Sequence, residues 1–355
     1  MTELFDKGHE QVVVREDRAT GLRAIIAIHS TILGPAAGGC RHWVYPDAAS
    51  ALDDALRLSE GMTFKNALAD IPFGGGKSVI FGVPGRSLTP EQLEIFGRWV
   101  EELGGRYVTA EDVGMSVEDL RMIARTTCYV SGVGASGLGG DPSPHTARGV
   151  LRGIEAAVRV RLGADSLGGV CVAIQGLGSV GWHLCRLLAE RGAEIRVADL
   201  APDRVQRAVE VCGARAVAAQ DVLSAEVDVI APCAMGSVLT RESVAALRAP
   251  VVAGSANNQL ASDEVGELLT RRGVLYAPDY VINAGGIVSV AHEYLGLDDP
   301  EWVETRIAGI AERLEVIFRR AAESGEATSR IADQLARERL ARAVSAATSA
   351  GSIAP

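Results

Sequence analysis

The sequence predicts a two-domain α/β fold, and three observations lead to this prediction. The chain has 355 residues, which is enough for two hydrophobic cores. The segment Gly132–Pro144, rich in Gly, Ser and Pro, is typical of a connector between domains. After this segment, short β-rich runs alternate with helical stretches, which indicates a parallel sheet with helices on both faces. We therefore expect one α/β domain on each side of the connector.

The elements of the first half follow from local patterns. Two β-rich runs, Gln11–Arg15 and Arg23–His29, flank a turn-forming segment and predict a hairpin. Apolar residues with helical spacing run from Ala48 to Met62 and predict an amphipathic helix that ends near Lys65. Beyond it we expect a glycine turn at 74–76, a strand at Ser78–Gly82, a helix at about 90–103 and a strand at Arg106–Ala110.

The second half alternates strands and helices. Helices are expected at Thr146–Val160 and Val180–Arg191, and strands at Val170–Gln175, Glu194–Asp199, Val227–Ala231, Val251–Ala253 and Val274–Tyr276. From Pro300 the chain reads as helical and rich in arginine, and a weakly structured tail is expected from Ser345.

Composition excludes several classes of partner. The net charge of −10 argues against a nucleic-acid or anionic membrane surface. No apolar stretch approaches the length that spans a bilayer, and the N-terminal sequence lacks the pattern of a signal peptide. Six cysteines are scattered singly without a CxxC pair, which indicates reduced thiols and supports no metal site. We therefore expect a cytoplasmic protein.

A glycine-rich turn in the second half has the spacing of a dinucleotide-binding loop. Gly176, Gly178 and Gly181, with Leu177, Ser179 and Val180 between them, follow a predicted strand and open a predicted helix. Such glycines allow a tight turn, a close approach of the backbone to a pyrophosphate, and close helix packing. The N-terminus of the helix supplies free N–H groups for the phosphate charge. The sequence therefore predicts a dinucleotide site here.

The next strand ends in an acidic residue that bears on the choice of cofactor. Asp199 lies eighteen residues past Gly181. A carboxylate at this place accepts hydrogen bonds from the ribose hydroxyls and repels a 2′-phosphate, so NAD is favoured over NADP. Arg204 either is a solvated helix residue or reaches such a phosphate.

Lysine is almost absent from this chain. It occurs only at positions 7, 65 and 77, among thirty-five basic residues. Lysine can lose its proton when it is desolvated, whereas arginine effectively cannot, so Lys65 and Lys77 are candidates for chemistry. Asp112 follows the predicted strand at 106–110 and is a candidate partner. Two lysines in a closed site would lower each other's pKa, so that one binds a carboxylate and the other serves as a base.

Seven motifs follow one another along the chain: GMTFKNALADIPFGGGKSVI, YVTAEDVG, GDPSPHTARGV, QGLGSVG, APCAMG, VVAGSANNQL and YAPDYVINAGG. Together they resemble the Glu/Leu/Phe/Val amino acid dehydrogenase family, and the resemblance runs from about Gly34 to the C-terminal helices. It implies a substrate domain at 1–138 completed by helices at 318–355, a Rossmann domain at 139–317, and an active-site cleft between them. It also implies reversible oxidative deamination of an L-amino acid to a 2-oxo acid and ammonia, coupled to NAD, in a homo-oligomer.

The resemblance assigns roles to individual residues. It implies that Lys65 holds the substrate carboxylate, that Lys77 is the base that activates water, and that Asp112 exchanges protons with the amino nitrogen. Further residues are expected at the substrate or the cofactor: Gly38, Gly39, Ala37, Ala110, Thr146, Cys233, Ala234, Asn257, Asn283, Ile287 and Val290.

The preferred amino acid is left open between leucine, valine and phenylalanine. Glutamate dehydrogenases resemble this chain around GPAAGGCR but carry a lysine where Ala37 stands, so glutamate is disfavoured. The small Ala37 is typical of some phenylalanine-type members. Ile287, Val290 and Ala110 instead resemble the leucine and valine type.

Two other functions remain as alternatives. One is a catalytically silent NAD-binding protein, against which the retention of Lys65, Lys77 and Asp112 argues. The other is a dehydrogenase of a 2-hydroxy acid, which normally uses a His–carboxylate pair; His145 is the one histidine in a plausible place.

Overall fold

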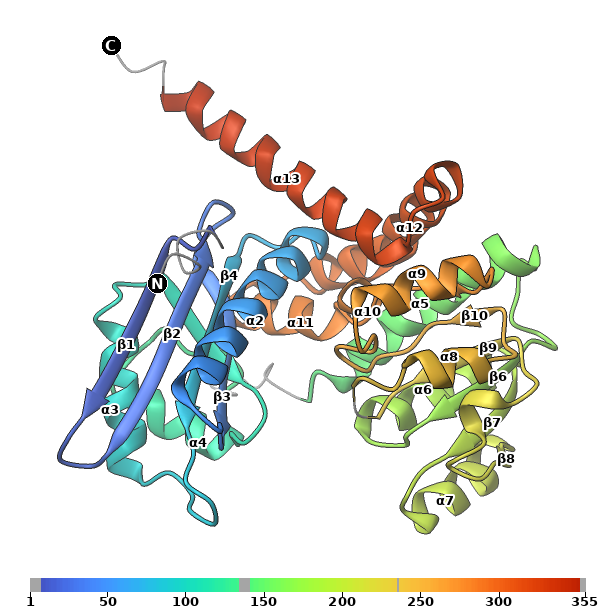
Figure 1. Ribbon diagram of the computed structural model, residues 1–355, viewed down its shortest axis with the longest axis horizontal. Helices are drawn as coiled ribbons and strands as arrows, with labels where there is room; N and C mark the ends of the chain where they lie inside the picture. The colour runs from blue at the N-terminus through green and yellow to red at the C-terminus, as the bar shows by residue number, and fades with distance from the viewer. Residues whose placement is uncertain (1–7, 134–140, 235, 352–355) are drawn as a thin grey trace. The chain divides into compact units, whose positions relative to one another are not determined.

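The computed structural model describes residues 8–133, 141–234 and 236–351, and the chain divides into two compact units (Figure 1). Unit 1 comprises Met1–Gly140, Val290–Asp298 and Ala336–Pro355, and unit 2 comprises Asp141–Ser289 and Asp299–Leu335. The sequence analysis expected the first domain to be completed by residues 318–355, whereas unit 1 takes up the chain again at Val290–Asp298 and at Ala336. Most of the connector expected at Gly132–Pro144 lies outside the described residues.

Unit 1 contains a five-stranded sheet. Its strands are β1 (Gln11–Asp17), β2 (Leu22–Ser30), β3 (Ala36–Trp43), β4 (Gly74–Phe81) and β5 (Tyr107–Glu111), in the order β1-β2-β4-β3-β5. The pairing of β1 with β2 is antiparallel, which confirms the predicted hairpin. By contrast, β3 runs parallel to both β4 and β5. The carboxyl ends of these three strands therefore lie at one edge of the sheet.

Helices cover both faces of this sheet. On one face, α2 (Ala48–Leu68) packs Ala51, Ala55 and Leu56 against apolar side chains of β2 and β4. On the other face, α3 (Pro90–Glu101) and α4 (Val117–Ile123) pack against the remaining side chains of the strands. The helix α2 ends at Leu68, three residues beyond the predicted end near Lys65, so Lys65 lies in its last turn.

The glycine turn expected at 74–76 is wrong, because these glycines belong to β4. A Cβ added at Gly75 would lie 2.1 Å from the backbone nitrogen of Thr63 on α2. A Cβ at Gly76 would lie 2.7 Å from the ring of Tyr107. The glycines therefore serve close packing of the strand against its neighbours, and Lys77 follows them inside the sheet.

Unit 2 contains a six-stranded sheet in which all strand pairs are parallel. Its strands are β6 (Cys171–Gln175), β7 (Glu194–Ala198), β8 (Arg215–Ala216), β9 (Val229–Pro232), β10 (Val251–Val252) and β11 (Leu275–Tyr276). The order β11-β10-β9-β6-β7-β8 is that of the Rossmann fold, and the strand order reverses between β6 and β9. Ligands of such sheets bind at that reversal.

The helices of unit 2 agree with the predicted alternation. They are α5 (Ser143–Leu162), α6 (Ser179–Glu190), α7 (Pro202–Cys212), α8 (Arg241–Ala246), α9 (Asp263–Arg271) and α10 (Asp279–Ile282). Three helices follow: α11 (Gly285–Tyr294), α12 (Pro300–Ser324) and α13 (Thr328–Gly351).

The weakly structured tail expected from Ser345 is wrong up to Gly351, because α13 continues to that residue. The segment is rich in alanine, which has the highest helix propensity. The hydroxyls of Ser345 and Thr348 donate to the carbonyls of Ala341 and Val344 one turn earlier, so these polar side chains are satisfied within the helix.

Candidate active site

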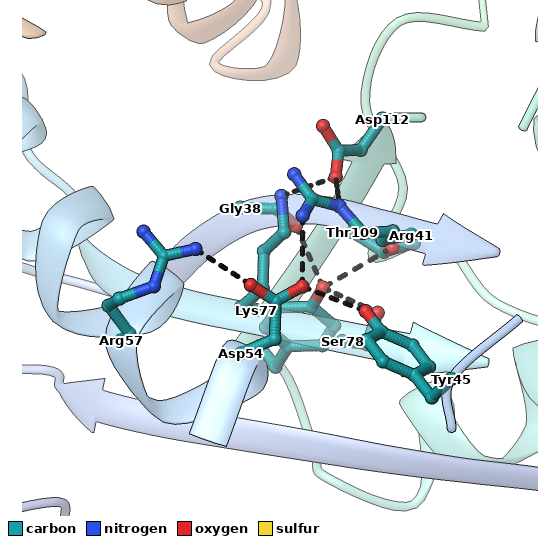
Figure 2. A network of polar contacts seen from close by, with 10 residues as sticks. Gly38, Arg41, Tyr45, Asp54, Arg57, Lys77, Ser78, Thr109 and Asp112 are labelled. Atoms are coloured by element: carbon teal, nitrogen blue, oxygen red, sulfur yellow. Dashed lines mark hydrogen bonds and ion pairs between the residues drawn. The ribbon is translucent and has the colours of Figure 1, made fainter. Parts of the chain in front are cut away.

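Lys77 and Asp112 form a buried ion pair in unit 1. Lys77 is carried by β4 and is only 5% exposed, whereas Asp112 directly follows the end of β5. The Nζ atom of Lys77 lies 2.8 Å from Oδ2 of Asp112 (Figure 2). The structure therefore brings together the two residues that the sequence analysis proposed as base and acid.

The environment shifts the pKa of both groups. Burial lowers the pKa of Lys77 below its usual value of 10.5, and the charge of Arg41 adds to this effect, although Asp112 opposes both. Burial by itself would raise the pKa of Asp112, but the charges of Lys77 and Arg41 outweigh it and hold that pKa below 3.8. Lys77 is therefore easier to deprotonate than an exposed lysine, and Asp112 remains a carboxylate.

Sequence reasoning missed a second cation at this pair. Arg41, on β3, donates from Nε to Oδ2 of Asp112 at 2.9 Å and from Nη1 to Oδ2 of Asp54 at 2.9 Å. The hydroxyl of Tyr45 and Nη2 of Arg57 also donate to Asp54, each at 2.8 Å (Figure 2). The signal that could have found Arg41 is its spacing, because residues two apart on a strand point to the same face. Arg41 stands two residues after Gly39 in GPAAGGCR.

The remaining substrate candidates of unit 1 lie on β3 and β5. Gly39 pairs in register with Ala110, and Ala37 pairs with Gly75. A Cβ at Gly39 would lie 2.8 Å from Cβ of Asp112, so only glycine leaves room for that side chain. A Cβ at Gly38 would lie 1.8 Å from the carbonyl oxygen of Gly76. Ala37 is buried, with 8% of its surface exposed, and Ala110 is half-buried.

Lys65 lies half-buried in the last turn of α2. The next residue, Asn66, is fully buried and donates from its amide to the carbonyl oxygen of Gly74 at 2.6 Å. This bond ties the end of α2 to the start of β4, the strand that carries Lys77. The role of Lys65 as an anchor for a substrate carboxylate stays a prediction.

The glycine loop of unit 2 fits a dinucleotide. Gly176 has a φ of +96°, and a Cβ there would lie 2.7 Å from Cβ of Ala234. A Cβ at Gly181 would lie 2.0 Å from the carbonyl oxygen of Gly176. A Cβ at Gly178 would meet no atom within 4 Å. Gly176 and Gly181 are thus required because a side chain at either position would clash with the protein. Gly178 instead faces open space at the N-terminus of α6, where a pyrophosphate would bind.

Asp199 lies beside this loop, and both of its carboxylate oxygens accept hydrogen bonds from backbone nitrogens. Its Oδ2 accepts a hydrogen bond from the backbone nitrogen of Leu177 at 2.6 Å, and its Oδ1 accepts one from Ala201 at 2.8 Å. Arg204 is largely exposed, and its Nη1 lies 3.8 Å from Oδ2 of Asp199. Asp199 therefore also holds the glycine loop, a task that the sequence analysis did not foresee.

The other cofactor candidates of unit 2 lie around β9, α5 and α11. Asn283 donates from its amide to Oδ1 of Asn257 at 2.7 Å. Thr146 lies in the first turn of α5, and a Cβ at Gly286 would lie 2.6 Å from its Oγ1. The backbone nitrogen of Cys233 donates to the carbonyl of Gln175, at the end of β6.

The remaining candidates are distributed over both units. Ser179 donates to Asp141 at 2.5 Å, and Val180 follows it in the first turn of α6. Ile287 and Val290 are both half-buried on α11, but Ile287 belongs to unit 2 and Val290 to unit 1. Among the described residues, no group of three or more His, Cys, Asp or Glu side chains could hold a metal ion. In the same part of the chain, no helix is long and apolar enough to cross a membrane.

Comparison with known families identifies the chain. Residues 9–129 match the dimerisation domain of Glu/Leu/Phe/Val dehydrogenases, and residues 196–348 match the Glutamate/Leucine/Phenylalanine/Valine dehydrogenase family. The chain belongs to this family. It is therefore an amino acid dehydrogenase, and the Rossmann fold of unit 2 implies a nicotinamide cofactor.

Individual members of the family are similar to almost the whole chain. Leucine dehydrogenase of Bacillus subtilis (strain 168) is 47% identical over 94% of this chain and 92% of its own length. Phenylalanine dehydrogenase of Bacillus thermotolerans is 43% identical over 95% of this chain and 90% of its own. The crystal structure of L-tryptophan dehydrogenase from Nostoc punctiforme superposes with a TM-score of 0.87 at 40% identity, covering 96% of this chain and 98% of that one. These dehydrogenases act on amino acids whose side chains differ widely in size.

Proposed function

We propose that this dehydrogenase deaminates apolar L-amino acids with NAD as the cofactor, and that leucine, valine and phenylalanine are its substrates. The observation that carries the proposal is the buried Lys77–Asp112 pair. The same sheet carries the buried Ala37 at the position where the resemblance implies a lysine in glutamate dehydrogenases. Alanine offers no charge to a side-chain carboxylate, so an apolar side chain is preferred. The names of the similar dehydrogenases agree with an apolar substrate.

The chemistry divides between a base and an acid. A nicotinamide cofactor held by unit 2 would supply the acceptor for a hydride from Cα of the amino acid, and loss of this hydride would leave an iminium carbon on the substrate. Lys77, as a neutral amine, takes a proton from the water that attacks this carbon, and burial favours its neutral form. Asp112 first takes a proton from the ammonium group of the amino acid, before the hydride leaves, and later returns this proton to the nitrogen of the carbinolamine that water addition forms. The C–N bond then breaks, the nitrogen leaves with the hydroxyl proton as ammonium, and the 2-oxo acid remains. Lys65, as a cation, holds the α-carboxylate.

The cofactor would be held by unit 2. The backbone at Gly178 and the first turn of α6 would receive the pyrophosphate, because a Cβ at Gly178 meets open space. Asp199 would receive the ribose hydroxyls, and this favours NAD over NADP. Thr146, Asn257 and Asn283 would lie near the nicotinamide and its ribose.

One panel of substrates tests the proposal. The purified protein is given leucine, valine, phenylalanine, tryptophan or glutamate with NAD⁺ or NADP⁺, and the absorbance of the reduced cofactor is followed. We expect leucine, valine or phenylalanine with NAD⁺ to react fastest, and the reverse reaction to require ammonia. A best rate with glutamate would overturn the proposed substrate class. Oxidation of 2-hydroxy acids without any need for ammonia in reverse would overturn the reaction.

The quaternary structure is a second part of the proposal. The match of residues 9–129 to a dimerisation domain supports a homo-oligomer. Light scattering coupled to size-exclusion chromatography measures the mass in solution. A mass equal to one 37.2 kDa chain at micromolar concentration would contradict an oligomer.

A further inference from the structure

The carboxylate of Asp112 binds two cations through a single oxygen. Nζ of Lys77 and Nε of Arg41 both lie within 2.9 Å of Oδ2. Within the described part of the chain, Oδ1 of Asp112 accepts no hydrogen bond. The side chain is therefore fixed through one oxygen, and the other oxygen is left for an exchange of protons.

Arg41 is itself held from the opposite side. Its Nη1 donates to Oδ2 of Asp54, a residue of α2 that is 16% exposed. Asp54 also accepts hydrogen bonds from Tyr45 and from Arg57, so it keeps two partners if Arg41 is removed. The planar guanidinium is thus fixed between two carboxylates, one on α2 and one after β5, a geometry that lysine cannot reproduce.

We propose that Arg41, held in place by Asp54, is a positioning residue that orients Asp112 and remains its counter-ion when Lys77 is neutral. The inference rests on the proposed function, in which Lys77 must lose its proton during each turnover. An ammonium that is deprotonated no longer compensates the charge of Asp112. Arg41 cannot be deprotonated in a protein, so Asp112 keeps a cationic partner throughout the reaction.

The groups around Lys77 agree with this role. The charged groups that face it are Asp112, after β5, and Arg41, on β3. The thiol of Cys40, also on β3, stays neutral because burial raises its pKa to about 12. On β2 the residue paired with Lys77 is the apolar Ala27, and α2 contributes Asp54, which acts through Arg41. Within this set, Arg41 is the cation that contacts the same carboxylate oxygen as Lys77.

The test compares Arg41→Gln with Arg41→Lys, and both with the surface control Arg125→Gln. Arg125 forms an exposed ion pair with Glu94 in the same unit and touches none of these groups. We expect Arg41→Gln to lower kcat by about 10²-fold, as a misplaced reacting group does. We also expect a shift in the pH profile of kcat/KM. Loss of the positive charge of Arg41 raises the pKa of Lys77, so the rise of kcat/KM that requires the deprotonated lysine should move to higher pH. Arg41→Lys should keep that limb near its original pH and recover part of kcat.

A double-mutant cycle tests the role of Asp54. Asp54→Asn should lower kcat less than Arg41→Gln does, and the double variant should be no worse than Arg41→Gln alone, because Asp54 acts through Arg41. If the fold-losses in kcat of the two single variants multiply in the double variant, Asp54 and Arg41 act independently. That result would overturn the proposal that Asp54 acts through Arg41. Thermal unfolding of each variant shows whether the fold is kept, and only folded variants enter the cycle.

The outcomes separate this inference from the proposed function. If the parent protein has no amino acid dehydrogenase activity with apolar substrates, the proposed function fails. If the parent is active but Arg41→Gln keeps its kcat and its pH profile, the inference about Arg41 fails and the function stands. A lowered kcat with an unshifted pH limb, the same in Arg41→Lys and Arg41→Gln, would indicate a structural role and would also overturn the inference.

Discussion

Lys77 and Lys65 have different surroundings, which separates their expected roles. Lys77 is buried in β4 against a carboxylate, and Lys65 lies half-buried at the end of a helix. Burial lowers the pKa of Lys77, which suits this side chain to give and take a proton. Arginine keeps the charge of lysine but cannot act as a base, so it distinguishes the two roles.

The first prediction uses this difference. Lys77→Arg should lower kcat by about 10²–10⁴-fold, as expected for the loss of a general base. Lys65→Arg should keep part of kcat with a raised KM for the amino acid, because a cation still meets the carboxylate. Steady-state kinetics of both variants measure this. The reverse pattern would mean that the two roles have been exchanged.

A second prediction concerns Asp199, whose oxygens accept backbone hydrogen bonds from Leu177 and Ala201. The parent should prefer NAD⁺ to NADP⁺ by more than about tenfold in kcat/KM, or about 1.4 kcal/mol. Asp199→Asn removes the charge but keeps one acceptor, so it should narrow this preference with little loss of stability. Asp199→Ala should also lower the melting temperature, because both backbone donors lose their acceptor. An unchanged cofactor preference in Asp199→Asn would contradict the proposed role of the carboxylate.

At the scale of the element, glycines fix where strands and loops can approach each other. Gly75 brings β4 against α2, and Gly181 brings α6 against the loop at Gly176. Gly61, on the exposed side of α2, meets no atom within 4 Å. The same substitution, glycine to alanine, should therefore have opposite consequences at these positions.

Gly75→Ala should destabilise the protein by about 1–3 kcal/mol, because its Cβ would overlap the backbone of Thr63. Gly61→Ala, on the same helix as Thr63, should stabilise the protein by about 0.5–1 kcal/mol, because it removes glycine from a helix interior. Denaturant unfolding measures both. Equal effects of the two substitutions would mean that the strand and the helix are not packed as closely as the structure shows.

A related prediction separates binding from stability in unit 2. Gly178→Ala should leave the melting temperature unchanged, since a Cβ there meets open space, yet raise the Kd for NAD⁺ by about tenfold or more. Gly181→Ala should lower the melting temperature, because its Cβ would overlap the carbonyl oxygen of Gly176. Thermal unfolding and fluorescence titration with NAD⁺ supply the two readouts. Unchanged affinity in Gly178→Ala would place the pyrophosphate elsewhere.

The sequence predicted the elements well where the signal is local. The hairpin, the strand–turn–helix at Gly176–Gly181 and the helices flanking β6 all depend on neighbouring residues, and the structure confirms them. The run at 74–76 was mistaken for a turn, because glycine marks both turns and close packing, and only the contact with Thr63 distinguishes them. The role of Arg41 was also missed because it depends on contacts that are distant in the sequence. Its carboxylate partners, Asp54 and Asp112, lie 13 and 71 residues away.

At the scale of the molecule, one titration couples the N-terminal segment to stability. His29, on β2, contacts the ring of His9 edge-on and Oγ1 of Thr63 at 2.8 Å. Burial, helped by the charge of His9, lowers the pKa of His29 from 6.5 to about 4. As pH falls from about 6.5 to about 4, the unfolded chain takes up a proton at this residue and the folded chain does not, so stability is lost over that range.

We therefore expect the melting temperature of the parent to fall between pH 7 and pH 4.5 more steeply than that of His29→Gln. Glutamine keeps a polar partner for Thr63 but does not titrate. Calorimetry at several pH values measures the difference between the two proteins, in which the contributions of the other acidic groups cancel. Parallel curves would show that His29 is protonated in the folded state as readily as in the unfolded one.

The division into two units has a consequence for redesign. Ala37 and Ala110, two of the positions that are expected to bear on the choice of amino acid, belong to unit 1, whereas Asp199 and Arg204, which bear on the choice of dinucleotide, belong to unit 2. Residues that share no partner contribute additively, so libraries at the two places can be screened separately and their best variants combined. An enzyme that makes a non-natural amino acid with a chosen nicotinamide cofactor could therefore be obtained by combining variants from two small, separate libraries.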